Sequence, residues 1–339
     1  MLEISDKTHR RPEHLPDQTD ERFLDAMNDA LLGARAAVPA ASAPVGPSLF
    51  VAGGPRSGTT FLAQALCQAF DVSWVDNLAA RFWKTPEVGV RLSRIVFGDM
   101  SERRDRLSFR SGFGRSELPW DIHGIHYFWM RMLGLDRVEN LFTGLEDRGI
   151  DASDVCAELA RIEAAGGAPV VYKGYYPSYF MRWFSERIPG SVFVLISRRP
   201  LHQARSIYRA RIAYNGDPGP WWSMQPPEIE ELEGRSPAEQ IAGQVFGLRR
   251  FYAKQLAEHG VKAVVIEYEE LISDPATVME KIRAEVESRT GLELRTTGFV
   301  PDVRAGTGGK PTEIDGELEE ALKAFEHWDE PWVSTEPSL

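Results

Sequence analysis

The sequence predicts an α/β fold: a single domain in which a central parallel sheet is flanked by helices. Two observations predict it. Short runs of β-branched and apolar residues alternate with helical stretches, and 43% of the 339 residues are hydrophobic, enough for one large core. Each of these runs is followed by a helical pattern, as expected for parallel strands. The expected core strands are residues 49–52, 170–172, 192–196 and 264–266.

The first 47 residues are expected to form a mobile extension, followed by the main domain at residues 48–339. Residues 1–20 are charged and contain two prolines, and residues 38–47 are rich in Ala and Pro, which is typical of a linker. Between them, apolar residues at helical spacing predict one amphipathic helix over residues 21–36. Its apolar face would pack on the body of the protein, on a second subunit in a homodimer, or on a docking partner. That face consists of Phe23, Leu24, Met27, Leu31 and Leu32.

Composition narrows the function. The chain has 39 basic and 50 acidic side chains, and this net charge of −11 argues against a general affinity for nucleic acid. Cys67 and Cys156 are too few for a disulfide framework and lack metal-ligand spacing. No apolar run is long enough to span a bilayer, and the N-terminus has no secretory pattern. We therefore expect a cytoplasmic protein without a transmembrane segment.

A glycine-rich segment after the first strand predicts an anion-binding loop. Residues 53–60 read Gly-Gly-Pro-Arg-Ser-Gly-Thr-Thr, and a helical pattern begins at the hydroxyl-rich end. The backbone N–H groups of such a turn and the helix N-terminus point at one spot, which suits a phosphate or sulfate. The spacing from Gly53 to Gly58 is that of a P-loop, so we expect a P-loop-type nucleotide-binding fold. Thr59 replaces the phosphate-binding lysine of ATPases and GTPases, which argues against a nucleoside triphosphate as the ligand.

A second basic cluster follows the strand at residues 192–196. Arg198 stands at the end of this strand, and the next helix has polar residues on one face. Guanidinium groups match phosphate in a bidentate way, so the cluster predicts a second anion site. A solvated basic helix face is the alternative. The polar face consists of His202, Arg205, Ser206 and Arg209.

A third segment, residues 303–310, is rich in glycine and has basic residues near both ends, Arg304 and Lys310. Its free backbone amides would suit a lid over a phosphate. A flexible surface loop has the same composition, so this segment supports an anion site only together with the other two.

These segments resemble the sulfotransferases that use 3′-phosphoadenosine 5′-phosphosulfate (PAPS). In that family Pro-Lys/Arg-Ser-Gly-Thr-Thr holds the 5′-phosphosulfate, and residues 55–60 match it position by position. The family's 3′-phosphate motif has a serine eight residues after an arginine, which is the spacing of Arg198 and Ser206. The family segment Arg-Lys-Gly-x-x-Gly resembles residues 304–309, with alanine in place of lysine. Residues 268–275 also resemble a family stretch, so the resemblance covers residues 48–310.

The resemblance implies transfer of a sulfuryl group from PAPS to a hydroxyl or amine of a small-molecule or carbohydrate acceptor, leaving adenosine 3′,5′-bisphosphate. Arg56 would hold the phosphosulfate, and Lys173, at a strand end, would stabilise charge on the leaving group. Because arginine and lysine supply positive charge, no metal is expected. The residues assigned to donor binding are Arg56, Ser57, Gly58, Thr59, Thr60, Arg198, Ser206, Arg304 and Gly306.

Several residues are candidates for the base that takes the acceptor proton. Family members often have Lys-Thr-His where this chain has Lys-Gly-Tyr175, and tyrosine, with an ordinary pKa of about 10, is a poor base at neutral pH. Other members use a glutamate about 20 residues after the P-loop arginine, as a general base. The nearest acidic residue here is Asp76, the first candidate. His123 and His126 are the next candidates, and each could instead be a structural histidine.

Two other functions remain open. A P-loop kinase or NTPase could use Glu267, at the end of the strand at residues 264–266, to bind its metal. A non-catalytic nucleotide-binding protein of this fold would explain the departure from the family pattern at residues 173–175. The pairing of Arg198 with Ser206 favours the sulfotransferase. The loop at residues 214–236, which contains two adjacent tryptophans, is a candidate lid on the acceptor side.

Overall fold

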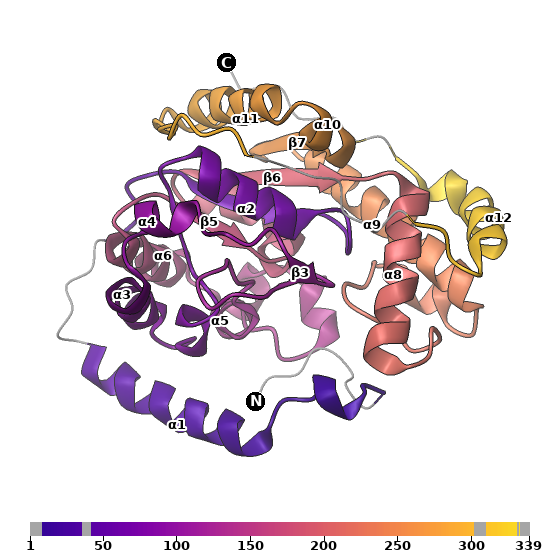
Figure 1. Cartoon of the computed structure of the whole chain (residues 1–339), viewed down its shortest axis with the longest axis horizontal. Helices are drawn as coiled ribbons and strands as arrows, with labels where there is room; N and C mark the ends of the chain where they lie inside the picture. The colour runs from indigo at the N-terminus through magenta and orange to yellow at the C-terminus, as the bar shows by residue number, and fades with distance from the viewer. Residues whose placement is uncertain (1–8, 36–41, 302–309, 331, 333–339) are drawn as a thin grey trace.

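The computed structural model describes residues 9–35, 42–301, 310–330 and 332. A five-stranded parallel sheet with the strand order β2-β5-β1-β6-β7 runs through the middle (Figure 1). Its strands are β1 (Ser48–Ala52), β2 (Ser73–Trp74), β5 (Val170–Lys173), β6 (Ser191–Ser197) and β7 (Ala263–Glu267). All four predicted strands are present, and the α/β fold with a central parallel sheet is confirmed. The two-residue strand β2 was not predicted.

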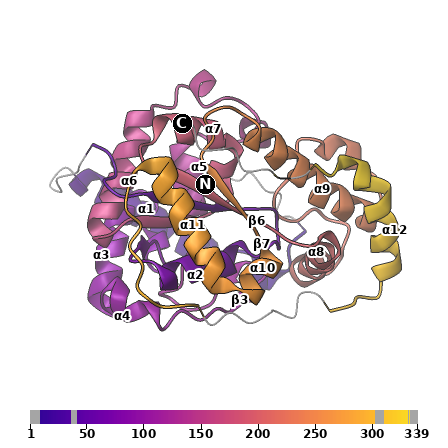
Figure 2. The same cartoon turned by 90° about the horizontal axis from the view of Figure 1, so that it is seen from above.

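Helices cover the sheet and extend beyond it. The helix after the glycine-rich loop, α2 (Thr59–Ala69), packs on β1 and β5, and α11 (Pro275–Thr290) packs on β6 and β7. In two perpendicular views, α3, α4 and α6 lie at one end of the molecule and α8, α9 and α12 at the other (Figures 1 and 2). Further helices are α1 (Gln18–Ala34), α3 (Pro86–Phe97), α4 (Met100–Arg104), α5 (His126–Met132), α6 (Ala152–Gly166), α7 (Met181–Arg187), α8 (Pro200–Asn215), α9 (Pro237–Leu256), α10 (Tyr268–Ser273) and α12 (Asp315–Phe325).

The sheet forms the centre of the core because its middle strand is buried on both faces. All five residues of β1 are buried, as the continuous apolar run at residues 49–52 requires. Phe50 stacks on Tyr172 of β5 and on Phe193 of β6, with ring centroids 5.2 and 5.1 Å apart. Each such buried aromatic side chain contributes about 1.5–3 kcal/mol to folding. The loop that leaves β1 therefore starts from a rigid base.

A second apolar cluster packs α8 against α9 and α12. Ile207 of α8, Val245 of α9 and Phe325 of α12 are among its buried members. This cluster fixes one face of α8, so the opposite face, which includes Ser206, is held against the loop after β1.

Described residues of the N-terminal segment contact the domain: Arg11 N donates to Tyr214 O, and the His14 ring lies against the Tyr214 ring. Helix α1 begins three residues earlier than predicted because Asp17 caps it, accepting hydrogen bonds from the N–H groups of Thr19 and Asp20. Asn28 ties α1 to the body by donating to Arg81 O at 2.8 Å. Phe23, on the predicted apolar face, is 67% exposed, so the body covers only part of that face.

A two-stranded antiparallel hairpin, β3 (Ser111–Gly112) and β4 (Arg115–Ser116), lies between α4 and α5 in the chain. Its turn consists of Phe113 and Gly114, which both have positive φ, at 49° and 93°. Two-residue hairpin turns favour this backbone because its twist matches that of the strands. Among the described residues, no helix combines the length and the apolar character needed to cross a membrane.

Candidate functional site

A large cavity opens at the carboxyl ends of the parallel strands, where α/β sheets bind their ligands. Its volume is about 1530 Å³, whereas a typical small-molecule site has roughly 300–1000 Å³. Two ligands can therefore lie in it together. The loop after β1 and the ends of β5 and β6 form one side of the cavity. The N-terminal segment, the β3–β4 hairpin, α5 and α8 supply much of the remaining lining.

The loop between β1 and α2 has the backbone of an anion cradle. Gly53 and Gly58 have φ values of 152° and 113°, which side chains rarely adopt, and a Cβ on either would come within 2.5 Å of a neighbouring atom. Gly58 is also the N-cap of α2, and no side chain caps this helix end. Its first N–H groups are therefore available to a phosphate or sulfate, as predicted from the sequence.

Three hydrogen bonds join this loop to the segment after β6. Arg56 has a φ of 66°, a conformation that costs energy for a residue with a side chain. Arg198 Nη1 donates to Arg56 O at 3.2 Å, and Gln203 Nε2 donates to Pro55 O at 2.8 Å. Arg56 Nε donates to Ser206 Oγ at 2.8 Å. The two anion sites predicted from sequence thus lie side by side and support one another.

The described part of the protein offsets the positive charge of this pair only in part: the Arg198 guanidinium lies 4.4 Å from the Tyr268 ring centroid, and Glu269 acts against the lowering of its pKa by burial. Arg56 and Arg198 form no ion pair with a carboxylate among the described residues, although Arg198 is only 7% exposed. Arg198 Nε is buried and has no hydrogen-bond partner within the described chain. Burial and the nearby Arg198 lower the pKa of Arg56 to about 10, so it stays charged at neutral pH. Buried cations without a carboxylate partner favour the binding of an anion.

Lys173 and Thr60 converge on one oxygen atom at the edge of the cradle. Lys173 Nζ donates to Gly114 O at 2.6 Å, and Thr60 Oγ1 donates to the same oxygen at 3.2 Å. Burial lowers the pKa of Lys173 from its ordinary 10.5 to about 8, with a further contribution from Arg56. Both side chains line the cavity, as do Thr59 and Gly58.

Both candidate histidines line the cavity, but they differ in what their rings can do. His123 Nδ1 accepts the N–H of Ile125 at 2.8 Å, so in the neutral ring the proton is on Nε2. His126 has no hydrogen bond from its ring to another described residue. Burial of the ring, together with the nearby charges of Lys173 and Arg115, lowers the pKa of His126 to about 4. Burial raises the pKa of Tyr175, which makes it a poorer base still.

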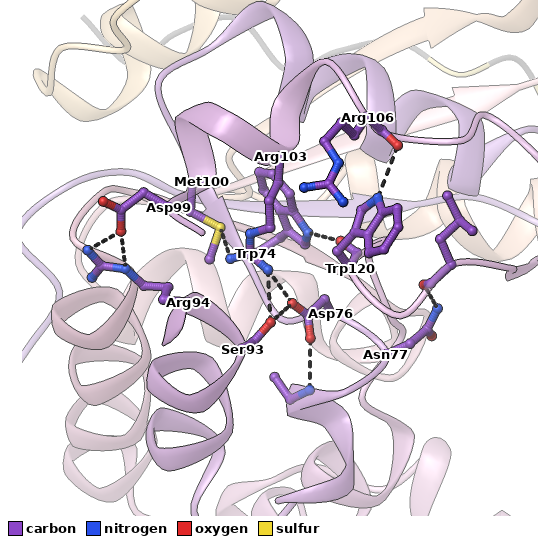
Figure 3. A network of polar contacts seen from close by, with 12 residues as sticks. Trp74, Asp76, Asn77, Ser93, Arg94, Asp99, Met100, Arg103, Arg106 and Trp120 are labelled. Atoms are coloured by element: carbon purple, nitrogen blue, oxygen red, sulfur yellow. Dashed lines mark hydrogen bonds and ion pairs between the residues drawn. The ribbon is translucent and has the colours of Figure 1, made fainter. Parts of the chain in front are cut away.

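Asp76, the first candidate base, belongs to a buried network of polar contacts (Figure 3). It is not among the residues that line the cavity, although its neighbour Asn77 is. Its Oδ2 lies 2.5 Å from Arg103 Nη1 and also accepts a hydrogen bond from Ser93 Oγ. Its Oδ1 accepts the N–H of Ala79 at 2.8 Å. The Arg103 and Asp76 side chains are 0% and 1% exposed. Because both carboxylate oxygens face protein donors, the geometry favours a role for Asp76 in holding α3 and α4 on β2 over the predicted role as the base.

On the predicted basic face of α8, one arginine forms an ion pair outside the cavity lining and another lines the cavity. Arg205 does not line the cavity, because it forms an ion pair with Asp315 at 2.6 Å. Arg209 lines the cavity and donates to Pro311 O at 3.1 Å. Glu267, the acid required by the kinase alternative, is not among the lining residues. Arg304 and Gly306 lie outside the described residues, but Lys310, next to them in sequence, lines the cavity.

Sequence reasoning missed the part of the wall made by the N-terminal segment. His14 and Leu15 line the cavity, and the buried Glu21 accepts a hydrogen bond from Tyr127 at 3.2 Å. Arg11 N donates to Tyr214 O at 2.8 Å, and the His14 ring lies 4.3 Å from the Tyr214 ring. This segment has no motif that could have predicted its role. It becomes part of the wall only because the folded chain brings it back to the cavity. The candidate lid contributes Trp222 and its neighbours to the same wall.

This geometry agrees with the comparisons to known proteins. The model of the sulfotransferase family matches residues 47–289, and the chain belongs to this family. The match includes the anion cradle, Lys173, the Arg198 segment and both histidines. No curated protein matches the chain.

Solved sulfotransferase structures resemble this one at low sequence identity. A sulfotransferase called STF9 from Mycobacterium avium aligns with a TM-score of 0.51 and 15% identity, covering 98% of this chain and 86% of its own. Another, called STF1, from Mycobacterium tuberculosis H37Rv, gives 0.45 and 13%, covering 90% and 80%. A sulfotransferase from Alicyclobacillus acidocaldarius gives 0.35 and 19%, covering 83% and 96%. The first of these supports a shared fold.

Proposed function

We propose that this sulfotransferase takes its sulfuryl group from PAPS and transfers it to a hydroxyl or amine of a small-molecule or carbohydrate acceptor. The observation that carries the proposal is the convergence of Lys173 Nζ and Thr60 Oγ1 on one oxygen atom beside the P-loop. A donor oxygen at that point would receive both hydrogen bonds, with the Arg56 cation nearby. PAPS supplies an activated sulfuryl group when bound, and the lysine stabilises the negative charge that develops on the oxygen it leaves.

The other end of the donor is assigned to Arg198 and Ser206. The buried Arg198 Nε has no partner among the described residues, and Ser206 is held at the cavity wall by Arg56. A 3′-phosphate there would accept hydrogen bonds from both residues and balance the arginine charge. The product adenosine 3′,5′-bisphosphate keeps this phosphate, so it should bind to the same groups. The cations come from side chains, and the proposed mechanism uses no metal.

His126 is the proposed base. Its ring is neutral at pH 7 and has a nitrogen free to take the acceptor proton, whereas the tautomer of His123 presents an N–H to the cavity. A pKa of about 4 is low for a base. The negative charges of a bound donor would offset Lys173 and Arg115 and raise the pKa of His126 toward neutrality.

Aromatic side chains in the cavity lining support a ring-containing acceptor. They come from four separate segments and leave flat apolar faces with polar tips, which suit either a phenol or a sugar ring. Charged residues of both signs also line the cavity, Arg81 and Arg115 with Glu13 and Glu21. The aromatic residues are Tyr127, Tyr175, Tyr176, Tyr214 and Trp222.

Calorimetric titration with adenosine 3′,5′-bisphosphate, without Mg²⁺, tests the donor. Binding in the micromolar range or tighter is expected, and its absence together with Mg²⁺-dependent binding of ATP would contradict the proposal. Transfer of labelled sulfate from PAPS across a library of phenols, sugars and amines then tests the reaction. Nucleotide binding without transfer to any member would favour a non-catalytic nucleotide-binding protein.

A further inference from the structure

The tip of the β3–β4 hairpin lies inside the proposed donor site. The Gly114 carbonyl accepts hydrogen bonds from Lys173 Nζ and Thr60 Oγ1, the two groups assigned above to the sulfuryl end of the donor. The ring of Phe113 lies 5.4 Å from the guanidinium of Arg56. The tip therefore engages three donor-binding residues at once, with a carbonyl in the place of an anionic oxygen and a ring against the cation.

Hairpin and donor cannot occupy this place together. The Thr60 hydroxyl has a single proton, so it donates either to Gly114 O or to the donor. An anionic oxygen accepts a stronger hydrogen bond from a lysine than a neutral carbonyl does, and it also balances the Arg56 charge. A bound donor therefore displaces the tip, at the cost of the contacts that the tip makes.

The hairpin is built to move at its tip and stay fixed at its base. Gly112 and Arg115 are exposed, and its two residue pairs are too few for a stable hairpin on their own. At the base, Phe109 N donates to Gln64 Oε1 at 2.6 Å, and Asn77 Nδ2 donates to Leu118 O at 2.7 Å. These anchors hold both ends of the segment on the body, so the turn between them can leave its contacts without displacing the base.

Tyr214 connects this movement to the acceptor side. Its ring contacts Phe113 at 6.0 Å between centroids, and the Arg115 guanidinium lies 5.5 Å from it. The same ring contacts His14 of the N-terminal segment at 4.3 Å and Trp222 at 5.8 Å. When the tip moves away, Tyr214 loses its contacts with the hairpin and keeps those with His14 and Trp222.

We infer that the hairpin at residues 111–116 is a gate that competes with the donor for Lys173, Thr60 and Arg56, and that donor binding opens it and frees the acceptor side. The inference rests on the proposed function, because it takes these three residues as the donor site. It makes donor binding the step that prepares the cavity for the acceptor. Phe113 holds the gate in its closed position, since its ring contacts both Arg56 and Tyr214.

Binding of PAPS and of adenosine 3′,5′-bisphosphate to the full chain tests the gate. Phe113→Ala removes the cation–π contact and should bind PAPS about three- to tenfold more tightly than the parent protein. Phe23→Ala, which removes an exposed ring on α1 outside the cavity, is the control and should leave both affinities unchanged. Equal or weaker binding of PAPS by Phe113→Ala overturns the gate.

Limited trypsin digestion of the unmodified protein gives a second test. Arg110 and Arg115 are exposed and flank the turn, so fragments that begin at Ser111 or Ser116 report on the hairpin. PAPS should speed their release, while cleavage after the exposed Arg295, outside the cavity lining, serves as the internal reference. Protection by PAPS would make the hairpin a lid that closes on the donor and would overturn the gate. If neither nucleotide binds to either variant, the proposed donor site itself fails.

Discussion

Arg56 Nε donates a 2.8 Å hydrogen bond to Ser206 Oγ across 150 residues of sequence, and this bond joins the glycine-rich loop to α8. The loop carries the cradle for one anion and α8 carries part of the site for another. If both bind the donor as proposed, a change at one of these sites should alter binding at the other.

Arg198→Ala should weaken binding of adenosine 3′,5′-bisphosphate by about 10- to 100-fold, since a hydrogen bond to a charged group contributes roughly 1.5–3 kcal/mol. AMP, which lacks the 3′-phosphate, should lose little affinity. Titration calorimetry of both nucleotides measures the ratio. Arg205→Ala is the matched control, because this arginine is on α8 but pairs with Asp315 outside the cavity lining. An unchanged ratio in Arg198→Ala would remove Arg198 from the 3′-phosphate site.

Donor affinity should depend on pH through Lys173. Its pKa of about 8 is below the ordinary 10.5, so the protonated amine, which attracts the donor, is present below pH 8 and is lost above it. The affinity for adenosine 3′,5′-bisphosphate is therefore expected to fall between pH 7 and pH 9. Lys173→Met should bind more weakly at pH 7 and show a flat profile over this window. A parent profile that is equally flat would argue against contact between Lys173 and the nucleotide.

His126→Gln should abolish most sulfate transfer to any acceptor found in the library, by about 10²- to 10⁴-fold, the usual contribution of a general base. Binding of adenosine 3′,5′-bisphosphate should stay within about twofold, because the ring does not belong to the proposed donor site. His123→Gln keeps an N–H on the side chain and should be milder. A larger loss in His123→Gln than in His126→Gln would reverse the assignment of the base.

Asp76→Asn should lower the free energy of unfolding by about 3–5 kcal/mol, because it leaves the Arg103 charge buried and unpaired. Denaturant unfolding measures the change. Asp99→Asn is the control: its partner Arg94 is at the surface, with Asp99 61% exposed, and the loss should stay below about 1 kcal/mol. If Asp76→Asn keeps its stability but loses sulfate transfer, the base assignment returns to Asp76.

The fold could be predicted because its signals are local, and the proposed donor site rests on equally local signals. Each strand next to the cradle is a continuous apolar run. In residues 53–60 the glycines indicate a tight turn, and the arginine, serine and threonine side chains indicate an anionic ligand. Strand β2 has only two residues and gives no pattern. Its place at the sheet edge is set by pairing with β5, which the sequence does not encode locally.

Asp76 shows that the distance between two residues in the sequence does not tell how a side chain is placed in the fold. Its distance in sequence from Arg56 suggested a base, but its direction is decided by Ser93 and Arg103, which belong to α3 and α4. Nothing in the sequence pairs these residues in advance. The acceptor side is similar, since its walls come from separate segments that meet only after folding.

The cavity wall formed by residues 12–21 lies outside the stretch of chain that matches the sulfotransferase family, residues 47–289. The part of the wall near His14 can therefore vary without any change in the residues that the family model covers. Comparing members over the shared stretch alone includes the proposed donor residues and the aromatic lining at residues 127–222, but it leaves out this N-terminal part of the cavity.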